Sequence, residues 1–197
     1  ARAVFGRWLA AGSPSARAAL PWWADQRDTA SIAAFRRRAE DAARGVAGAR
    51  MTHREALYVA AAASAYLALA SGDTTKALAH FAALPDSTCL GCYLDRLREG
   101  QVLAARKRYR DAAALFGERL FVQLTPTEVS MALDRARAAE QVGDRQAAGD
   151  AFALVVGAWS GADAQLQAMV AEAQAGLQRL GRTPAPKVAA APGTASR

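Results

Sequence analysis

The chain has 197 residues, a net charge of +7 and 52% hydrophobic residues. This length is sufficient for one compact domain with a core, but much of the hydrophobic content is alanine, which forms helices well and buries little apolar surface. Runs of alternating β-branched and aromatic residues are missing, which argues against strands.

Prolines, glycines and capping residues divide the chain into successive helices. The clearest start signals are Thr52-His53-Arg54-Glu55 and Thr125-Pro126-Thr127-Glu128, because a Thr followed three residues later by a Glu can form a capping box. Pro21 kinks its helix or marks its effective start, and the Ala/Pro-rich tail 181–197 reads as a linker or extended arm. We predict helices over Val4–Ala11, Ala16–Gln26, Ser31–Arg44, Thr52–Ala70, Thr75–Leu84, Tyr93–Arg106, Tyr109–Val122, Pro126–Val142, Asp144–Ala158 and Ala162–Leu180.

One motif recurs three times, at spacings of 35 and then 36 residues. Each copy is a turn followed by a helix that carries an Ala and, four residues later, a Phe. A fixed period of this length is the signature of a helical repeat. Twelve residues before each Ala stands another small residue, which lets two helices pack closely. The Ala/Phe pairs are Ala77/Phe81, Ala112/Phe116 and Ala148/Phe152, and the preceding small residues are Ala65, Gly100 and Ala136.

These features resemble the tetratricopeptide repeat family, most closely over Thr52–Trp159. The resemblance implies an all-α fold of stacked antiparallel helical hairpins, a tetratricopeptide-like α-solenoid with a C-terminal capping helix and an extended tail. We therefore predict a degenerate hairpin over 1–50, three hairpins and the capping helix over 51–180, and the tail over 181–197. The large aromatic residue near the start of each first helix is absent, because Ala61, Arg96 and Ala132 stand there.

In that family the first helices line a concave groove that accepts a peptide or a helix. Since no catalytic constellation is present in the sequence, we predict a protein that is not an enzyme and has neither cofactor nor metal site. The resemblance places the following residues in the partner-binding groove: Val59, Ala62, Tyr66, Leu94, Leu97, Gln101, Leu133 and Arg137.

Cys89-Leu90-Gly91-Cys92 is the one motif with chemical potential. A Cys-x-x-Cys sequence can form a disulfide, a redox pair or half of a zinc site, or hold two packed thiols. Structural zinc needs two further ligands, and His80 is the only nearby histidine. Covalent haem attachment needs a histidine where Tyr93 stands. A disulfide between Cys89 and Cys92 is therefore one of the open readings.

Basic and aromatic clusters bear on the choice of partner. Arg36–Arg38 and Arg106–Arg110 could bind phosphates, but acidic residues are interleaved with both and no recognition helix is evident, which argues against nucleic acid. Trp22 and Trp23 cannot both face one core, so we expect one of them to be partly exposed or covered by the N-terminal helix.

The leading hypothesis is a non-catalytic protein–protein interaction scaffold or structural subunit of a larger bacterial assembly or homo-oligomer. The chain also looks like the C-terminal repeat regions of some bacterial signalling proteins, so an accessory or sensor region is an alternative, as is a redox or metal module that uses the two cysteines. The preference for Arg and Ala is typical of a GC-rich bacterial genome, so we expect a bacterial origin. The apolar run Tyr58–Ala70 is too short to span a bilayer.

We therefore expect a soluble domain, cytoplasmic or periplasmic, that reaches a membrane only through a partner or a missing anchor. Because the chain begins Ala-Arg-Ala without Met, the possibility of an upstream segment stays open.

Overall fold

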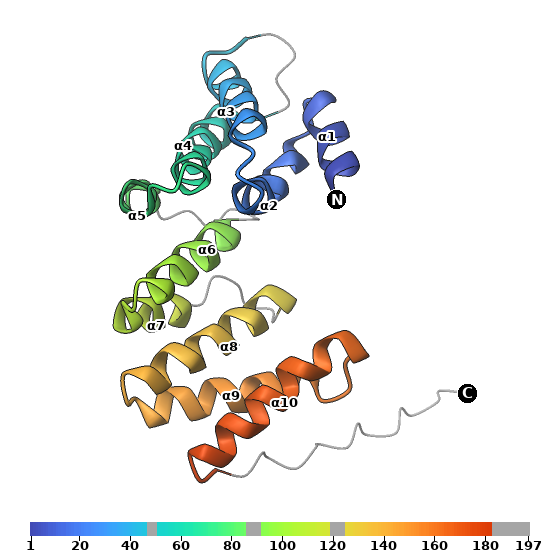
Figure 1. Cartoon of the computed structure of the whole chain (residues 1–197). Helices are drawn as coiled ribbons and strands as arrows, with labels where there is room; N and C mark the ends of the chain where they lie inside the picture. Colours follow the sequence, from blue (N-terminus) through green and yellow to red (C-terminus); the bar gives the residue numbers. More distant parts are fainter. Residues whose placement is uncertain (47–50, 86–91, 119–124, 183–197) are drawn as a thin grey trace, which may run out of the picture. The chain divides into compact units, whose positions relative to one another are not determined.

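The computed structural model describes residues 1–46, 51–85, 92–118 and 125–182 (Figure 1). Regular structure in these residues is helical throughout and none of it is strand, which confirms the predicted all-α class. The chain divides into two compact units, Ala1–Leu103 and Ala104–Arg197. The predicted division at residues 50 and 180 differs from this one and stays a prediction. The helices are α1 (Arg2–Ala10), η1 (Pro14–Ala19), α2 (Leu20–Asp25), α3 (Thr29–Ala43), α4 (His53–Ala70), α5 (Thr74–Ala82), α6 (Cys92–Ala105), α7 (Tyr109–Gly117), α8 (Pro126–Gln141), α9 (Arg145–Trp159) and α10 (Ala164–Arg179).

The two predicted capping residues begin α4 and α8. The Thr52 hydroxyl accepts a hydrogen bond from the backbone N–H of Glu55 at 3.3 Å. At α8 the capping box is complete, because Thr125 accepts from the Glu128 N–H at 3.3 Å while the Glu128 carboxylate accepts from the Thr125 N–H at 2.7 Å. Each bond satisfies a backbone donor that the helix itself leaves free. The side chains in the sequence thus fix where these two helices start.

A single turn geometry joins several successive helices. After α4, Gly72 has a positive φ of 83° and the Asp73 N–H returns to the Ala68 carbonyl at 2.9 Å. After α8, Gly143 has a φ of 77° and the Asp144 N–H returns to the Ala139 carbonyl at 3.0 Å. This is the Schellman motif, in which a left-handed residue lets the next N–H satisfy a terminal carbonyl. Each Asp then caps the following helix, at 2.9 Å from the backbone nitrogen three residues on.

The same turn occurs where the sequence has no glycine. Arg27 precedes the cap Asp28 with a φ of 54°, and Lys107 precedes Arg108 with a φ of 60°. Asp28 caps α3 through the Ser31 N–H at 3.0 Å, whereas Arg108 makes no side-chain cap bond to α7. A non-glycine residue in the left-handed region costs about 1–2 kcal/mol. These two turns are therefore strained versions of the Gly-Asp turn.

In unit 1 (Ala1–Leu103), α4 packs against α2, α3 and α5. Ala65 on α4 and Ala77 on α5 are both fully buried, and Tyr66 meets Phe81 edge to face with ring centroids 5.3 Å apart. The small residues thus allow the close helix contact that the repeat pattern predicts. The larger side chains of this core are Leu20, Trp23, Ile32, Phe35, Val59, Tyr66 and Phe81.

The N-terminal part of unit 1 differs from the sequence prediction in one place. The single helix expected over Ala16–Gln26 is a 3₁₀ segment, η1, followed by the short helix α2. Pro21 lies in the first turn of α2, where its missing N–H breaks no intrahelical hydrogen bond. Trp23 is buried and Trp22 is half-buried, with its ring 5.4 Å from that of Phe5 on α1, which confirms the expected split of the tryptophan pair.

In unit 2 (Ala104–Arg197), α7 packs on α8, α8 on α9 and α9 on α10. Helix α7 ends at Gly117, earlier than the predicted Val122, because Glu118 is extended with a ψ of 119°. Helix α10 packs through an apolar stripe, since its residues Val170, Ala173 and Leu177 are buried. The larger side chains of this core are Val129, Leu133, Phe152, Val155, Val156, Trp159, Val170 and Leu177.

Candidate interaction surface

The α4 residues of the predicted groove are buried inside unit 1. Val59 is 1% exposed, and Ala62 and Tyr66 are fully buried. Helix α4 is apolar around most of its circumference, so neighbouring helices cover several of its faces. In this structure these three side chains therefore belong to the core and present no surface to a partner.

The other groove residues divide between core and surface. Leu133 is 2% exposed and belongs to the core of unit 2. Leu94, Leu97 and Gln101 on α6 are half-buried, and Arg137 on α8 has a side chain that is 48% exposed. These four are the groove residues that a partner can reach.

A buried polar cluster ties α6 to the rest of unit 1. Among the residues that the structure describes, Asp95 is the one charged residue that is buried, with 3% of its surface exposed. Its carboxylate accepts a hydrogen bond from Arg17 Nη2 at 2.6 Å and from the Tyr58 hydroxyl at 3.1 Å. The Arg17 guanidinium also lies 4.9 Å from the centre of the Tyr58 ring, where the π-face attracts a cation. Next to it, the Tyr66 hydroxyl donates to the Leu94 carbonyl at 3.5 Å.

Electrostatics make this cluster an interdependent set. Burial raises the pKa of Asp95 above its ordinary value, and the charge and hydrogen bond of Arg17 oppose that rise. Burial also raises the pKa of Tyr58, and the nearby Asp95 charge adds to the effect, so Tyr58 stays a neutral donor. An ion pair in such a site is costly to break, because the remaining charge keeps its desolvation penalty without its partner. The arrangement ties α6 to η1 and α4.

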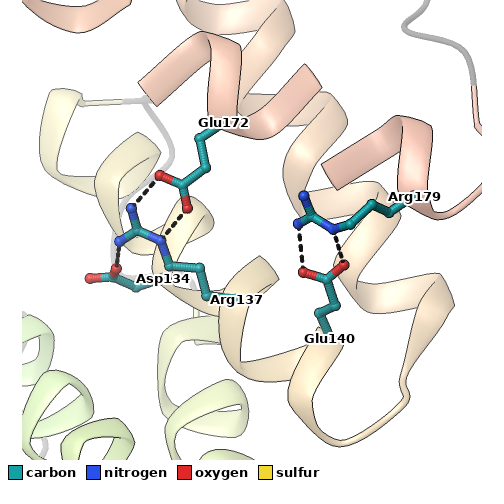
Figure 2. Close-up of polar contacts among 5 residues, drawn as sticks. All are labelled: Asp134, Arg137, Glu140, Glu172 and Arg179. Carbon is teal, nitrogen blue, oxygen red and sulfur yellow. Dashed lines mark hydrogen bonds and ion pairs between the residues drawn. The ribbon is translucent and has the colours of Figure 1, made fainter. Parts of the chain in front are cut away.

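Two reciprocal ion pairs join α8 to α10 in unit 2 (Figure 2). Arg137 on α8 donates through Nε and Nη2 to both carboxylate oxygens of Glu172 on α10, each at 2.6 Å. Arg179 on α10 donates in the same two-pronged way to Glu140 on α8, at 2.9 and 2.8 Å. Asp134 completes the group, 2.7 Å from Arg137 Nη1. Each helix thus contributes one arginine and one glutamate to the pairing.

Contacts beyond the end of α10 continue this pattern onto α9. Arg182 donates to Asp150 at 2.7 Å and to Gln146 at 2.6 Å. Its side chain crosses Gly149, where a Cβ atom would lie 2.7 Å from Arg182 Cδ. Arg145 donates to the Leu180 carbonyl at 3.0 Å. The glycine therefore leaves room for an arginine that ties the end of α10 to α9.

The pairing shifts the titration of both glutamates. Hydrogen bonds from Arg137 and Arg179 lower the pKa of Glu172 and Glu140, respectively, below the ordinary value of 4.5. The same contacts raise the pKa of both arginines. All four side chains are between 26% and 54% exposed, so water and salt screen the attraction. The two pairs therefore fix how α10 is aligned along α8 more than they add to the stability of the fold.

The sequence interpretation placed Arg137 in the groove but predicted neither the Arg17–Asp95 pair nor the pairs between α8 and α10. Arg17 and Asp95 are 78 residues apart, and no local pattern marks a buried carboxylate on α6. A usable signal did exist for α8 and α10, because Glu172 follows Arg137 by 35 residues, which is the repeat period. Opposite charges at equivalent positions of successive repeats would have pointed to that pair.

The structure does not test the predicted disulfide, and it adds one observation each on metal binding and on membrane spans. Cys89 lies outside the described residues and Cys92 begins α6, but its side chain is not described, so the disulfide stays a prediction. In the described ranges no three His, Cys, Asp or Glu side chains gather in a way that could hold a metal ion. Among the same residues, no helix combines the length and apolar character that crossing a bilayer requires.

Comparison with known proteins gives no relative for this chain: no family model, curated protein or solved structure matches it.

Proposed function

We propose that the protein is a non-catalytic scaffold for protein–protein contacts, built from tetratricopeptide-like hairpins. The first support is the recurrent turn at residues 72–73 and 143–144, with variants at 27–28 and 107–108. The second is the burial of the small residues at the predicted helix contacts, since Ala65, Ala77, Ala136 and Ala148 are all 0% exposed. Both features suit hairpins whose helices approach closely.

The contacts between first helices carry the proposal most directly. In a helical repeat, the first helices of successive hairpins lie side by side, so equivalent positions meet at the repeat period. Tyr58 on α4 bonds Asp95 on α6 at a separation of 37 residues. Arg137 on α8 bonds Glu172 on α10 at a separation of 35 residues. On this proposal, α10 holds the position of a further first helix.

The binding face is the exposed part of the predicted groove. Leu94, Leu97 and Gln101 provide a half-buried apolar and polar strip on α6, which suits contact with an extended or helical segment of a protein partner. Arg137 is the accessible groove position on α8, and it is engaged with Asp134 and Glu172. We therefore assign the first contacts of a partner to α6.

Affinity capture with substituted baits tests this function. Tyr66→Arg is unsuitable because it would bury a charge in the core of unit 1. Leu97→Arg places a charge on the half-buried strip of α6 instead. Leu57→Arg is the matched control, since Leu57 lies on α4 outside the predicted groove and is 52% exposed. The proposal expects the wild type and Leu57→Arg to retain the same specific partner and Leu97→Arg to lose it; retention by all three would contradict it.

A further inference from the structure

The first part of the chain has an unusual distribution of charge and aromatic residues. Residues 1–24 contain Arg2, Arg7 and Arg17 but no Asp or Glu, and they contain three of the four tryptophans. Arg17 is directed inward to Asp95. The rest of this basic and aromatic set lies in α1 and around the tryptophan pair.

Helix α1 is attached to unit 1 through aromatic contacts and contains no buried residue. The Phe5 ring lies 5.4 Å from Trp22 and 6.4 Å from Trp23, and it also contacts Trp8 at 5.5 Å. Trp8 and Trp22 remain half-buried, and Val4 is 37% exposed. An apolar and aromatic face is thus only partly covered by the fold.

Cations border this face. Arg7 and Trp8 follow Val4 by three and four residues, so both lie beside Val4 on the helix surface. Arg2 and Arg7 are exposed. From α3, Arg38 reaches the turn after α1, since a Cβ built on Gly12 would lie 4.0 Å from its Nη1 atom. The surface is therefore a tryptophan-bearing strip with three arginines nearby.

We propose that α1 and the adjacent Trp22 form a docking surface for an anionic lipid bilayer, with α1 lying in the interfacial plane. Indole rings suit the boundary between water and acyl chains because they are apolar and carry one polar N–H. Arginines on an amphipathic helix add attraction to acidic headgroups. A protein scaffold with this surface gathers its partner at a membrane. This inference is independent of the α6 face, because it uses different residues.

The test uses the full 197-residue chain and phospholipid vesicles of two compositions. Vesicles of phosphatidylcholine alone are compared with vesicles that contain about 30% phosphatidylserine. We expect sedimentation with the anionic vesicles, a blue shift of tryptophan fluorescence, and loss of both at about 0.5 M salt. Replacing Arg2 and Arg7 with Gln should weaken binding about fivefold for each arginine removed. Trp8→Ser should abolish the blue shift contributed by α1 and weaken sedimentation.

Matched variants distinguish weaker binding that is caused by lost charge from weaker binding that is caused by unfolding. Arg2→Lys with Arg7→Lys keeps the charge and should retain binding, and Arg110→Gln, at an exposed site in unit 2, should have no effect. Unchanged far-UV circular dichroism of every variant shows that the fold is intact. Equal affinity for the two kinds of vesicle, no binding to either, or undiminished binding by the Arg2→Gln/Arg7→Gln variant would overturn the proposal. Self-association through α1 without lipid binding would overturn it as well.

Discussion

The contact between α9 and α10 predicts opposite behaviour for two helical glycines. Gly176 on α10 faces Phe152 on α9, and a Cβ atom added at Gly176 would lie 2.5 Å from Phe152 Cζ and 2.7 Å from Cδ2. Phe152 is fully buried, so its ring has little space to yield. Gly157 on α9 is the matched control, because a Cβ atom there would meet nothing within 4 Å.

The magnitude follows from two opposing terms. Changing Gly to Ala within a helix gains about 0.5–1 kcal/mol because the unfolded chain loses freedom. At Gly176 the gain is opposed by overpacking, which typically costs about 1–3 kcal/mol. The helix gain is similar at both sites, so the difference between the variants isolates the packing term. We expect Gly176→Ala to be less stable than Gly157→Ala by about 1–3 kcal/mol.

Urea unfolding followed by far-UV circular dichroism measures this difference. The midpoint of Gly157→Ala should equal or exceed that of the wild type, and the midpoint of Gly176→Ala should fall below both. Equal midpoints for the two variants, or a higher one for Gly176→Ala, would show that α10 does not pack on Phe152 as described.

Three further predictions concern the charged groups and the turns. Arg17→Met leaves the buried Asp95 carboxylate without its counter-charge, so it should lower the free energy of unfolding by about 3 kcal/mol, whereas the double variant Arg17→Met/Asp95→Leu should recover most of that loss; no recovery would refute the pairing. The folded-state pKa values of Glu140 and Glu172 lie below 4.5, so their ion pairs stabilise the fold above that pH, and this stability is lost as the pH falls through the lowered values. The contribution is at most about 1 kcal/mol per exposed pair. The double variant Glu140→Gln/Glu172→Gln should remove this dependence of the melting temperature on acid pH in thermal melts. Asp95 acts in the opposite direction, since a raised folded-state pKa favours the fold at low pH. Because Lys107 and Gly72 both hold a positive φ, Lys107→Gly should raise the free energy of unfolding by about 1 kcal/mol and Gly72→Ala should lower it by a similar amount. If chemical denaturation shows that both substitutions change the stability in the same direction, the turn assignment is refuted.

Local signals in the sequence predicted local structure well. Thr52, Thr125 and the Gly-Asp turns are short-range devices, in which a side chain or a glycine satisfies backbone groups a few residues away. Their effect hardly depends on the rest of the fold. The helix starts, the turns and the apolar stripe of α10 could therefore be read directly.

Contacts between distant segments could not be read in the same way. The family resemblance places Val59, Ala62 and Tyr66 on an open face, but α4 is apolar on several sides and the surrounding helices bury all three residues. The Arg17–Asp95 pair depends on how η1 and α6 meet, which no pattern within either segment specifies. Which face of a helix stays open is decided by packing, and this is why half of the predicted groove belongs to the core.

The affinity of the captured partner for three forms of the chain tests the scaffold proposal most directly. Isothermal titration should give the same dissociation constant for the wild type and for Leu57→Arg. Leu97→Arg should bind at least about tenfold more weakly, as expected when a charge is placed at a desolvated contact. An unchanged dissociation constant for Leu97→Arg, with its fold intact by circular dichroism, would contradict the assignment of the binding face to α6.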